Sequence, residues 1–233
     1  MTMKRIQAPP SKARLCYESL RTAILRGDLR PGSRIVIDEL TRQMGVSRIP
    51  IREALQRLQG EGLVELEPHV GVRVADIDAD SVHEMFQLKE ALEVISGRSA
   101  CERMSEEDLA RAEEILRIMD EVIDDPDRWS EENVRFHKFI CDCAHMPLVG
   151  ASMLRVLDHW ERLRRYYQDE VFMQRHRVAH QEHWEILKAL RMRDPDYLER
   201  VTHEHNRKSI LAYAPGPGVS PRNAGTAMHG DSE

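Results

Sequence analysis

The chain has 233 residues, of which 41% are hydrophobic and 32% charged, and its formal net charge is −6. This length accommodates two modest domains. The sequence has no run of about 18 apolar residues and no apolar signal-type core at its N-terminus, so it predicts neither a membrane span nor export, and we expect a cytoplasmic protein. The four cysteines form no CxxC pair and are expected to be free thiols.

The charge is unevenly distributed along the chain. Residues 1–74 contain 13 Lys or Arg against 8 Asp or Glu, a net charge of +5, and the remaining residues carry −11. A basic segment joined to an acidic one is typical of a protein whose first part meets phosphates and whose second part has another role.

The first elements are predicted from apolar spacing and from glycine and proline. Residues 1–12 are polar and contain prolines, so we expect a flexible N-terminus. A helix is predicted from Arg14 to Arg26, because its apolar residues recur at helical spacing and Gly27 follows. A turn is expected over residues 30–32.

The next segment has the pattern of two short helices joined by a tight turn. The first is predicted from Asp38 to Met44 and ends at Gly45, since glycine adopts the left-handed conformation without steric cost. Ser47 is expected to cap the second helix from its side-chain oxygen. That helix then turns three apolar residues inward, Ile51, Leu55 and Leu58. A helix-turn-helix is therefore predicted over about residues 37–58.

Two arginines and a hairpin complete a winged helix-turn-helix pattern. Arg48 and Arg52 lie four residues apart at the exposed start of the second helix, where such helices contact base edges and phosphates. Apolar residues then alternate over residues 63–74, which predicts a β-hairpin with its tip at Pro68 to Gly71. We assign residues 13–76 to this DNA-binding domain.

The rest of the chain has only helical periodicity. After a brief linker over residues 75–80, apolar stripes at alternating spacings of three and four begin at Ser81. Further helices are predicted over about residues 129–144, 147–169, 171–192 and 195–213. An antiparallel all-α bundle is expected over residues 81–212, so the fold class is mainly α, and residues 213–233 are expected to be a disordered tail.

Histidines occupy inward positions in three of these helices. His137, His183 and His205 each stand in the apolar stripe of a separate helix. A single histidine in such a stripe is more often a hydrogen-bonded core residue than a ligand. Three can instead converge on a metal ion, which neutral imidazoles bind at about 2.0–2.1 Å and which satisfies polar atoms that are costly to bury.

A resemblance to a known family is carried by the segment from Gly45, which reads GVSRIPIREALQRLQGEGLVELEPHVGVRV. It is similar to the signature of the GntR family of bacterial winged-helix transcription regulators. The helical part resembles the ligand-sensing FCD subgroup, and the likeness covers roughly residues 12–212. That subgroup's pattern has an acidic residue four before a histidine in a DxxFH-like stretch, then a second and a third histidine. The matching residues here are Asn133, His137 in FHKFI, His183 in EHWEIL and His205.

The resemblance implies a divalent metal cofactor, with zinc as the first choice and nickel or another transition metal as alternatives. Asn133 departs from the expected aspartate, because an amide offers only a neutral carbonyl oxygen. We therefore expect weaker metal binding and a greater need for an anionic ligand. The alternative is a site that has lost its metal and binds an effector through histidine hydrogen bonds.

Further residues are implied in effector binding. Lys89 stands where the family commonly places an arginine that reaches into the effector pocket, so a carboxylate would meet a point charge. A solvated helix lysine is the alternative. His176 and His180 lie on the same stripe as His183 and are expected to line the cavity, although half-exposed surface positions explain them equally well.

At the DNA end, the resemblance implies contacts from residues of the helix-turn-helix and the wing tip. Arg42 is expected to contact the sugar-phosphate backbone of the DNA rather than a base. Ile49 stands where the family often has threonine and Val70 where it often has arginine, and both departures bear on the operator sequence. The expected DNA-contacting residues are Arg42, Ser47, Arg48, Arg52, His69 and Gly71.

The implied mechanism is a homodimer that presents two winged helices to a palindromic double-stranded DNA operator. A small acidic metabolite, bound in the helical core against the metal and Lys89, is expected to release a repressor by favouring one arrangement of the DNA modules. The alternatives are a helical metalloenzyme with an accessory DNA module, and a constitutive DNA binder with a structural bundle. We expect no catalysis, because Asn133 cannot act as a general base.

Overall fold

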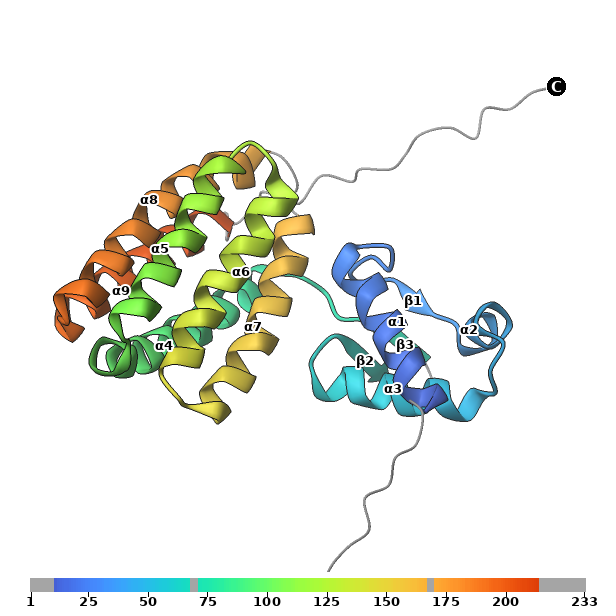
Figure 1. The fold of residues 1–233 in the computed structure, drawn as a ribbon. Coiled ribbons are helices and arrows are strands. Elements are labelled where there is room, and N and C mark those ends of the chain that lie inside the picture. Colours follow the sequence, from blue (N-terminus) through green and yellow to red (C-terminus); the bar gives the residue numbers. More distant parts are fainter. Residues whose placement is uncertain (1–10, 68–70, 167–169, 214–233) are drawn as a thin grey trace, which may run out of the picture.

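Two groups of elements follow one another along the chain, a small unit with a β-sheet and a bundle of helices (Figure 1). The computed structural model describes residues 11–67, 71–166 and 170–213. The first unit consists of α1 (Lys12–Arg26), β1 (Arg34–Ile35), α2 (Ile37–Met44), α3 (Arg48–Gly60), β2 (Val64–Glu67) and β3 (Gly71–Val74). The second consists of α4 (Ala79–Arg103), α5 (Glu106–Glu121), α6 (Pro126–Cys143), α7 (Pro147–Tyr166), α8 (Glu170–Met192) and α9 (Pro195–Tyr213). The predicted fold class is confirmed.

The first unit is a winged helix-turn-helix. α1 packs against α3, and the core between them is apolar, comprising Leu20, Ile24, Ile51, Leu55 and Leu58. Gly45 follows α2 with a φ of 63°, a left-handed conformation that glycine adopts without strain. The turn therefore ends α2 where the sequence predicted, and α3 begins after it at Arg48.

The sheet is antiparallel, with the strand order β1-β3-β2. Val64 pairs with Val74 and Leu66 with Val72, so the apolar side chains of the hairpin share one face. β1 pairs with β3 and was not predicted, because a two-residue strand is too short to show alternation. Residues 68–70 of the predicted wing tip, His69 and Val70 included, lie outside the described residues.

The prediction that the side-chain oxygen of Ser47 caps α3 is wrong, although the position of Ser47 is as predicted. Ser47 does stand at the N-cap of α3 with extended backbone, but its side chain makes no capping hydrogen bond. An N-cap oxygen accepts from the second or third N–H of a helix, and the third residue of α3 is Pro50, which has none. Ser47 is exposed, so its hydroxyl faces solvent.

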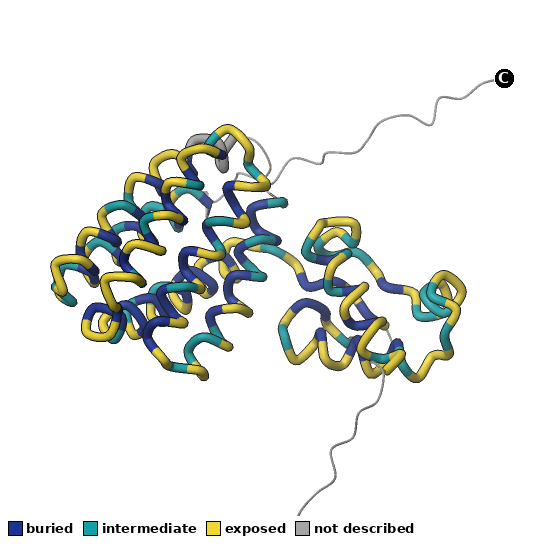
Figure 2. The backbone as a smooth tube through the Cα atoms, viewed as in Figure 1, coloured by how far each residue is buried: buried dark blue, intermediate teal, exposed yellow. Residues whose placement is uncertain are grey.

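In the second unit, α4 packs against α6, α7, α8 and α9, while α5 packs on α6 and α8. Buried residues follow the inward faces of these helices (Figure 2). α4 begins two residues earlier than predicted, because Asp78 caps it by accepting from the Ser81 N–H at 2.8 Å. Gly97 of α4 lies directly against Leu198 of α9, where a Cβ would clash, so its lack of a side chain permits the close approach of these two helices.

The two units touch through α7, which lies on the side of the bundle nearest the winged helix (Figure 1). Arg21 of α1 pairs with Asp158. His159 Nε2 lies 2.9 Å from the backbone oxygen of Glu61, and Arg162 donates to the backbone oxygen of Ala75 at 2.7 Å. We call these three hydrogen-bonded and ionic contacts the interdomain contact. Every one of them uses a side chain from residues 158–162.

Two expectations about whole-chain properties can be compared with the structure. All four cysteines are free, as predicted, and the structure shows that all four are buried. Across the described ranges, no helix combines the length and the apolar character needed to cross a membrane.

Candidate functional site

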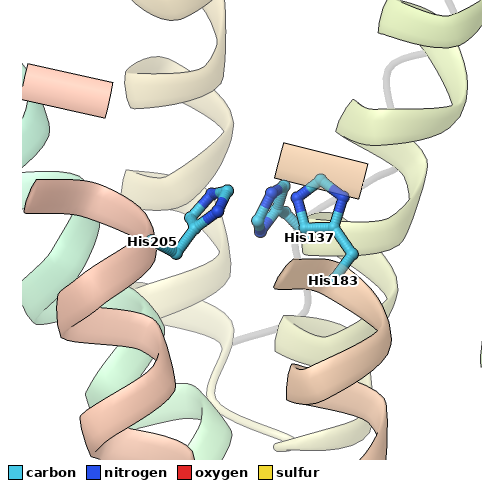
Figure 3. A group of neighbouring side chains, drawn as sticks. All are labelled: His137, His183 and His205. Atoms are coloured by element: carbon cyan, nitrogen blue, oxygen red, sulfur yellow. The ribbon is translucent and has the colours of Figure 1, made fainter. Parts of the chain in front are cut away.

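The three predicted histidines converge in the core of the bundle, one from each of α6, α8 and α9 (Figure 3). Each offers one ring nitrogen, and these nitrogens all lie within 4.8 Å of one another. His137, His183 and His205 are 3%, 0% and 4% exposed. We call this group the histidine triad.

Several ring nitrogens of the triad lack partners. Nε2 of His137 and both nitrogens of His183 are buried without a hydrogen-bond partner among residues 11–67, 71–166 and 170–213. A buried polar atom left unsatisfied costs about 1–3 kcal/mol, so such groups are rare and need an explanation. Because unpaired imidazole nitrogens at this spacing are the donors that zinc prefers, the residues present fit a metal ion.

Two carboxylates orient the outer histidines. His137 Nδ1 lies 2.6 Å from Glu93 Oε1, and His205 Nδ1 lies 2.8 Å from Glu182 Oε2. Metal-binding histidines commonly donate their second N–H to a carboxylate, which fixes the tautomer and the ring orientation. In both residues the Nδ1 contact leaves Nε2 for the centre of the triad.

The protonation state of the triad suits a metal ligand. Burial lowers the pKa of all three histidines, in the case of His205 to about 4. All three rings are therefore neutral at neutral pH, the form in which imidazole binds a metal.

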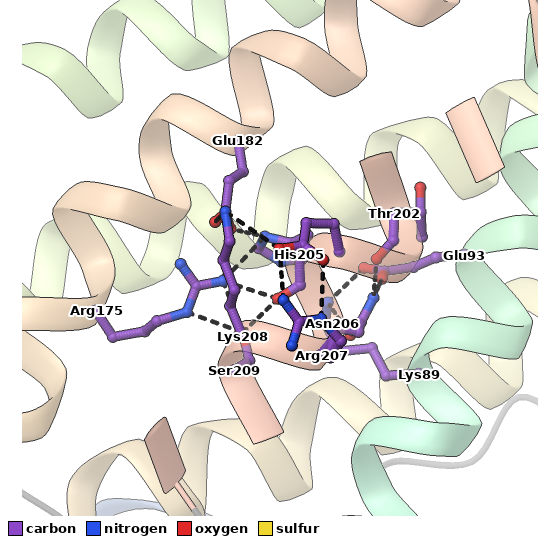
Figure 4. Close-up of polar contacts among 11 residues, drawn as sticks. Lys89, Glu93, Arg175, Glu182, Thr202, His205, Asn206, Arg207, Lys208 and Ser209 are labelled. Carbon is purple, nitrogen blue, oxygen red and sulfur yellow. Dashed lines mark hydrogen bonds and ion pairs between the residues drawn. The ribbon is translucent and has the colours of Figure 1, made fainter. Parts of the chain in front are cut away.

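Lys89 and Glu93 form a buried ion pair beside the triad (Figure 4). Lys89 Nζ lies 2.5 Å from Glu93 Oε1, and Asn206 donates to the other carboxylate oxygen at 2.6 Å. Burial alone would raise the pKa of Glu93, but Lys89 and His137 outweigh it and hold this pKa well below the usual range. Lys89 is 2% exposed, so the alternative of a solvated lysine is wrong. It lines the cavity with its charge already paired.

A small cavity of about 20 Å³ adjoins the triad. Asn133 lines it one helical turn before His137 and is 3% exposed. Arg175 also lines the cavity, together with the aromatic residues Phe86, Trp129, Trp160 and Tyr213. His180 is absent from the lining, because its Nε2 turns toward Asp120 Oδ1 at 2.6 Å, whereas His176 is part of it.

The sequence reasoning missed four polar residues of the site. Glu93 was unremarked because a Lys–Glu pair four residues apart is ordinary on an exposed helix face, and only burial gives this pair its role. Arg175 and Glu182 lie seven residues apart on α8, each one position before a histidine of the stripe that includes His183, so the periodicity of that stripe did not point to them. Asn206 follows His205 directly and faces Glu93 on another helix.

The predicted DNA-contacting residues lie together on the winged helix where the structure describes them. Arg48, Arg52 and Gly71 line one surface groove of about 250 Å³. Arg34 of β1 also lines this groove and was missed, because β1 was not predicted. Arg48 pairs with Asp38 at 2.7 Å, and Arg42 and Ser47 are exposed nearby on α2 and before α3.

Comparison with known families gives two matches that together cover most of the chain. Residues 12–74 match the bacterial regulatory proteins of the gntR family. Residues 84–208, more than half of the chain, match the FCD domain.

Individual relatives agree with these matches. The HTH-type transcriptional repressor NanR of Klebsiella aerogenes is 26% identical over 95% of this chain and 92% of its own length. The HTH-type transcriptional regulator YdhC of Bacillus subtilis, itself uncharacterized, is 28% identical over 71% of this chain and 78% of its own. Among solved structures, E. coli McbR/YncC has the same fold, with a TM-score of 0.70 over 87% of this chain and 96% of that one, at 22% identity.

Proposed function

This chain belongs to the gntR family of bacterial regulatory proteins and carries the FCD domain, and from that premise we propose that it is a metabolite-responsive repressor whose FCD domain binds a metal ion and a small carboxylate. Members of this family are transcription regulators that bind DNA operators and are not enzymes. What we propose is which ligands regulate DNA binding and which residues hold them.

The observation that carries the proposal is the set of unpaired nitrogens in the histidine triad. His183 is fully buried and both of its ring nitrogens lack partners among the described residues. His137, His183 and His205 would hold the ion, with zinc as the first choice and nickel as an alternative, and Asn133 would offer a neutral oxygen beside them. When bound, the ion supplies a Lewis-acidic partner for a carboxylate oxygen.

The charge of the site favours an anionic effector. Three neutral imidazoles and one amide contribute no negative charge toward the ion. Glu93 is the nearest buried carboxylate on α4, and Lys89 already neutralises it. A carboxylate effector would neutralise part of the charge of the ion. An aspartate in place of Asn133 would have supplied some of this negative charge.

For DNA, the exposed start of α3 supplies the contacts that the proposal needs. Arg48 and Arg52 would meet base edges and phosphates, and Gly71 with Arg34 would follow the phosphates from the wing side. Arg42, Ser47 and His69 remain proposed DNA contacts.

A homodimer fits the proposal, because a palindromic operator requires two winged helices related by a two-fold axis. An exposed apolar face on α4 supports it. Leu88 and Ile95 are 49% and 47% exposed at positions seven residues apart, and the exposed Ala91 lies between them. A second copy of the chain would bury this stripe by helix packing.

The test begins with the metal content of the purified full-length protein, measured by mass spectrometry after dialysis against zinc chloride. The zinc-loaded protein is then used to select the genomic DNA fragments that it binds. The affinity for these fragments is measured by fluorescence anisotropy, with and without acetate, pyruvate and succinate. We expect one bound ion per chain and a carboxylate that weakens DNA binding. One operator affinity across all metal and carboxylate conditions would favour a constitutive DNA binder instead.

A further inference from the structure

Arg175 is a buried cation beside the histidine triad whose hydrogen-bonding capacity is only partly used. It lies on α8, is 7% exposed and lines the same cavity as His137 and His205. Its Nε donates to Ser209 Oγ at 3.2 Å, and its Nη2 donates to Glu182 Oε2 at 2.5 Å and to the backbone oxygen of His205 at 2.8 Å (Figure 4). Nη1 is buried and has no hydrogen-bond partner in the described part of the chain.

An unpaired guanidinium nitrogen in the core indicates that an acceptor is missing. Removing charged donors from water without an acceptor is costly, more so than for neutral groups. The other two nitrogens fix the plane of the guanidinium, so Nη1 is held in one direction. Nη1 belongs to a charged group and its N–H donors are free, so an anionic acceptor such as a carboxylate suits it better than a neutral acceptor.

With a divalent ion bound, the side chains around the cavity would carry too little negative charge to neutralise it, by two charges. Lys89 and Glu93 neutralise each other. Glu182 is shared by Arg175, by His205 and by Lys208, whose Nζ lies 3.1 Å from Oε1. Glu93 and Glu182 thus each already face a cation, although Glu182 Oε1 has no hydrogen-bond partner among the described residues, and a divalent ion on the triad would add a charge of 2+ that these pairs do not offset.

We propose that Arg175 is a second anchor for the effector and that the effector is a compact dicarboxylate, with one carboxylate toward the histidine triad and its ion and the other accepting hydrogen bonds from Arg175 Nη1. The inference rests on the proposed function, because the first carboxylate needs the ion. Arg175 Nη2 lies 3.4 Å from His205 Nδ1, and the opposite edge of that ring faces the triad. The two anchors are therefore close together, which favours a short dicarboxylate over a long one.

The size of the cavity adds a condition. A volume of about 20 Å³ holds roughly one water molecule and not a dicarboxylate. Binding must therefore move the helices that line the cavity, and two charged contacts supply more of the required free energy than one. A dicarboxylate that prefers the widened arrangement would shift the equilibrium toward it, whereas a monocarboxylate of equal length would do so less.

The experiment measures carboxylate binding to the zinc-loaded full-length protein by isothermal titration calorimetry. Succinate and malonate are compared with butyrate and acetate, which carry one carboxylate. The variants are Arg175→Met and, as a control on the same helix, Arg177→Met, whose side chain is exposed and pairs with Asp124. Arg175→Lys replaces Arg175→Met if the latter does not fold, since it keeps a charge but not the fork.

We expect the wild-type protein and Arg177→Met to bind one of the dicarboxylates at least tenfold more tightly than either monocarboxylate, and Arg175→Met to lose this preference while still binding zinc. Equal affinity for one and two carboxylates in the wild type, or a preference that survives in Arg175→Met, overturns the role of Arg175 and leaves the proposed function intact. A wild-type protein that binds neither zinc nor any of these carboxylates fails the proposed function itself.

Discussion

Replacing His183 by methionine should make the metal-free protein more stable and the zinc-loaded protein less stable than the wild type. In the absence of metal, His183 buries two ring nitrogens without partners, and each unsatisfied group costs about 1–3 kcal/mol. Methionine removes both groups, has a similar length and adapts its shape, so repacking should cost less than about 1.5 kcal/mol. We therefore expect a net gain of at least about 0.5 kcal/mol in EDTA.

With zinc present, the order should reverse. An ion that binds only the folded protein stabilises it by about 2.7 kcal/mol at a free concentration 100-fold above its Kd. The wild type gains this free energy, whereas the His183→Met variant has lost one of three histidine ligands. Urea unfolding in EDTA and in buffered zinc gives both differences, and each 1 kcal/mol corresponds to roughly 2–4 °C in Tm for a chain of this size.

The control is Leu187→Met, which introduces the same side chain at a buried position one turn later on α8. It should lose less than about 1.5 kcal/mol and retain the full effect of zinc. If His183→Met is less stable than the wild type in EDTA, its nitrogens have partners and the reasoning is wrong. If zinc stabilises both proteins equally, the histidine triad is not where the metal binds.

Three further predictions concern other parts of the molecule. Glu93→Gln should cost about 3–5 kcal/mol in urea unfolding because it strands the buried Lys89, and adding Lys89→Met should recover most of it, whereas additive losses would contradict a coupled pair. Arg52→Met should weaken operator binding and reduce the slope of log K against log salt by about 1, and an unchanged slope would exclude a phosphate contact. Burial lowers the pKa of His159 and outweighs the Glu61 carbonyl, which favours the protonated ring, so the charged ring is costly to bury at the interdomain contact. The free energy that neutral His159 contributes there is complete above about pH 6.5 and is lost as pH falls below it; small-angle scattering should show the winged helix separating from the bundle in the wild type and not in His159→Gln.

The sequence predicted the parts of the site that follow from the periodicity of a single helix. His137, His183 and His205 were identified because each stands in an apolar stripe, and their convergence follows once the helices form a bundle. Lys89 was placed near the effector pocket, but its pairing with Glu93 depends on burial, which two charges four residues apart do not reveal.

Contacts between helices far apart in the sequence were less accessible. The Arg175 guanidinium meets Ser209 and the His205 carbonyl on α9, and this depends on the rotation of two helices about their axes. At the DNA end, β1 was missed for a related reason, because Arg34 and Ile35 form a strand only by pairing with β3. Short elements that exist through their partners leave no periodic trace.

The position of α7 has a consequence for genetics. Trp160 lines the cavity, while Asp158, His159 and Arg162 of the same helix form the interdomain contact. Five residues of helix span only about 6 Å, so the proposed effector site and the DNA-binding domain are joined through little more than one helical turn. For the metabolite-responsive repressor proposed above, selection for mutants that stay repressed in the presence of inducer should therefore yield substitutions clustered at residues 158–162. Such alleles would keep normal operator affinity and normal zinc content, and would lose only the response to the metabolite.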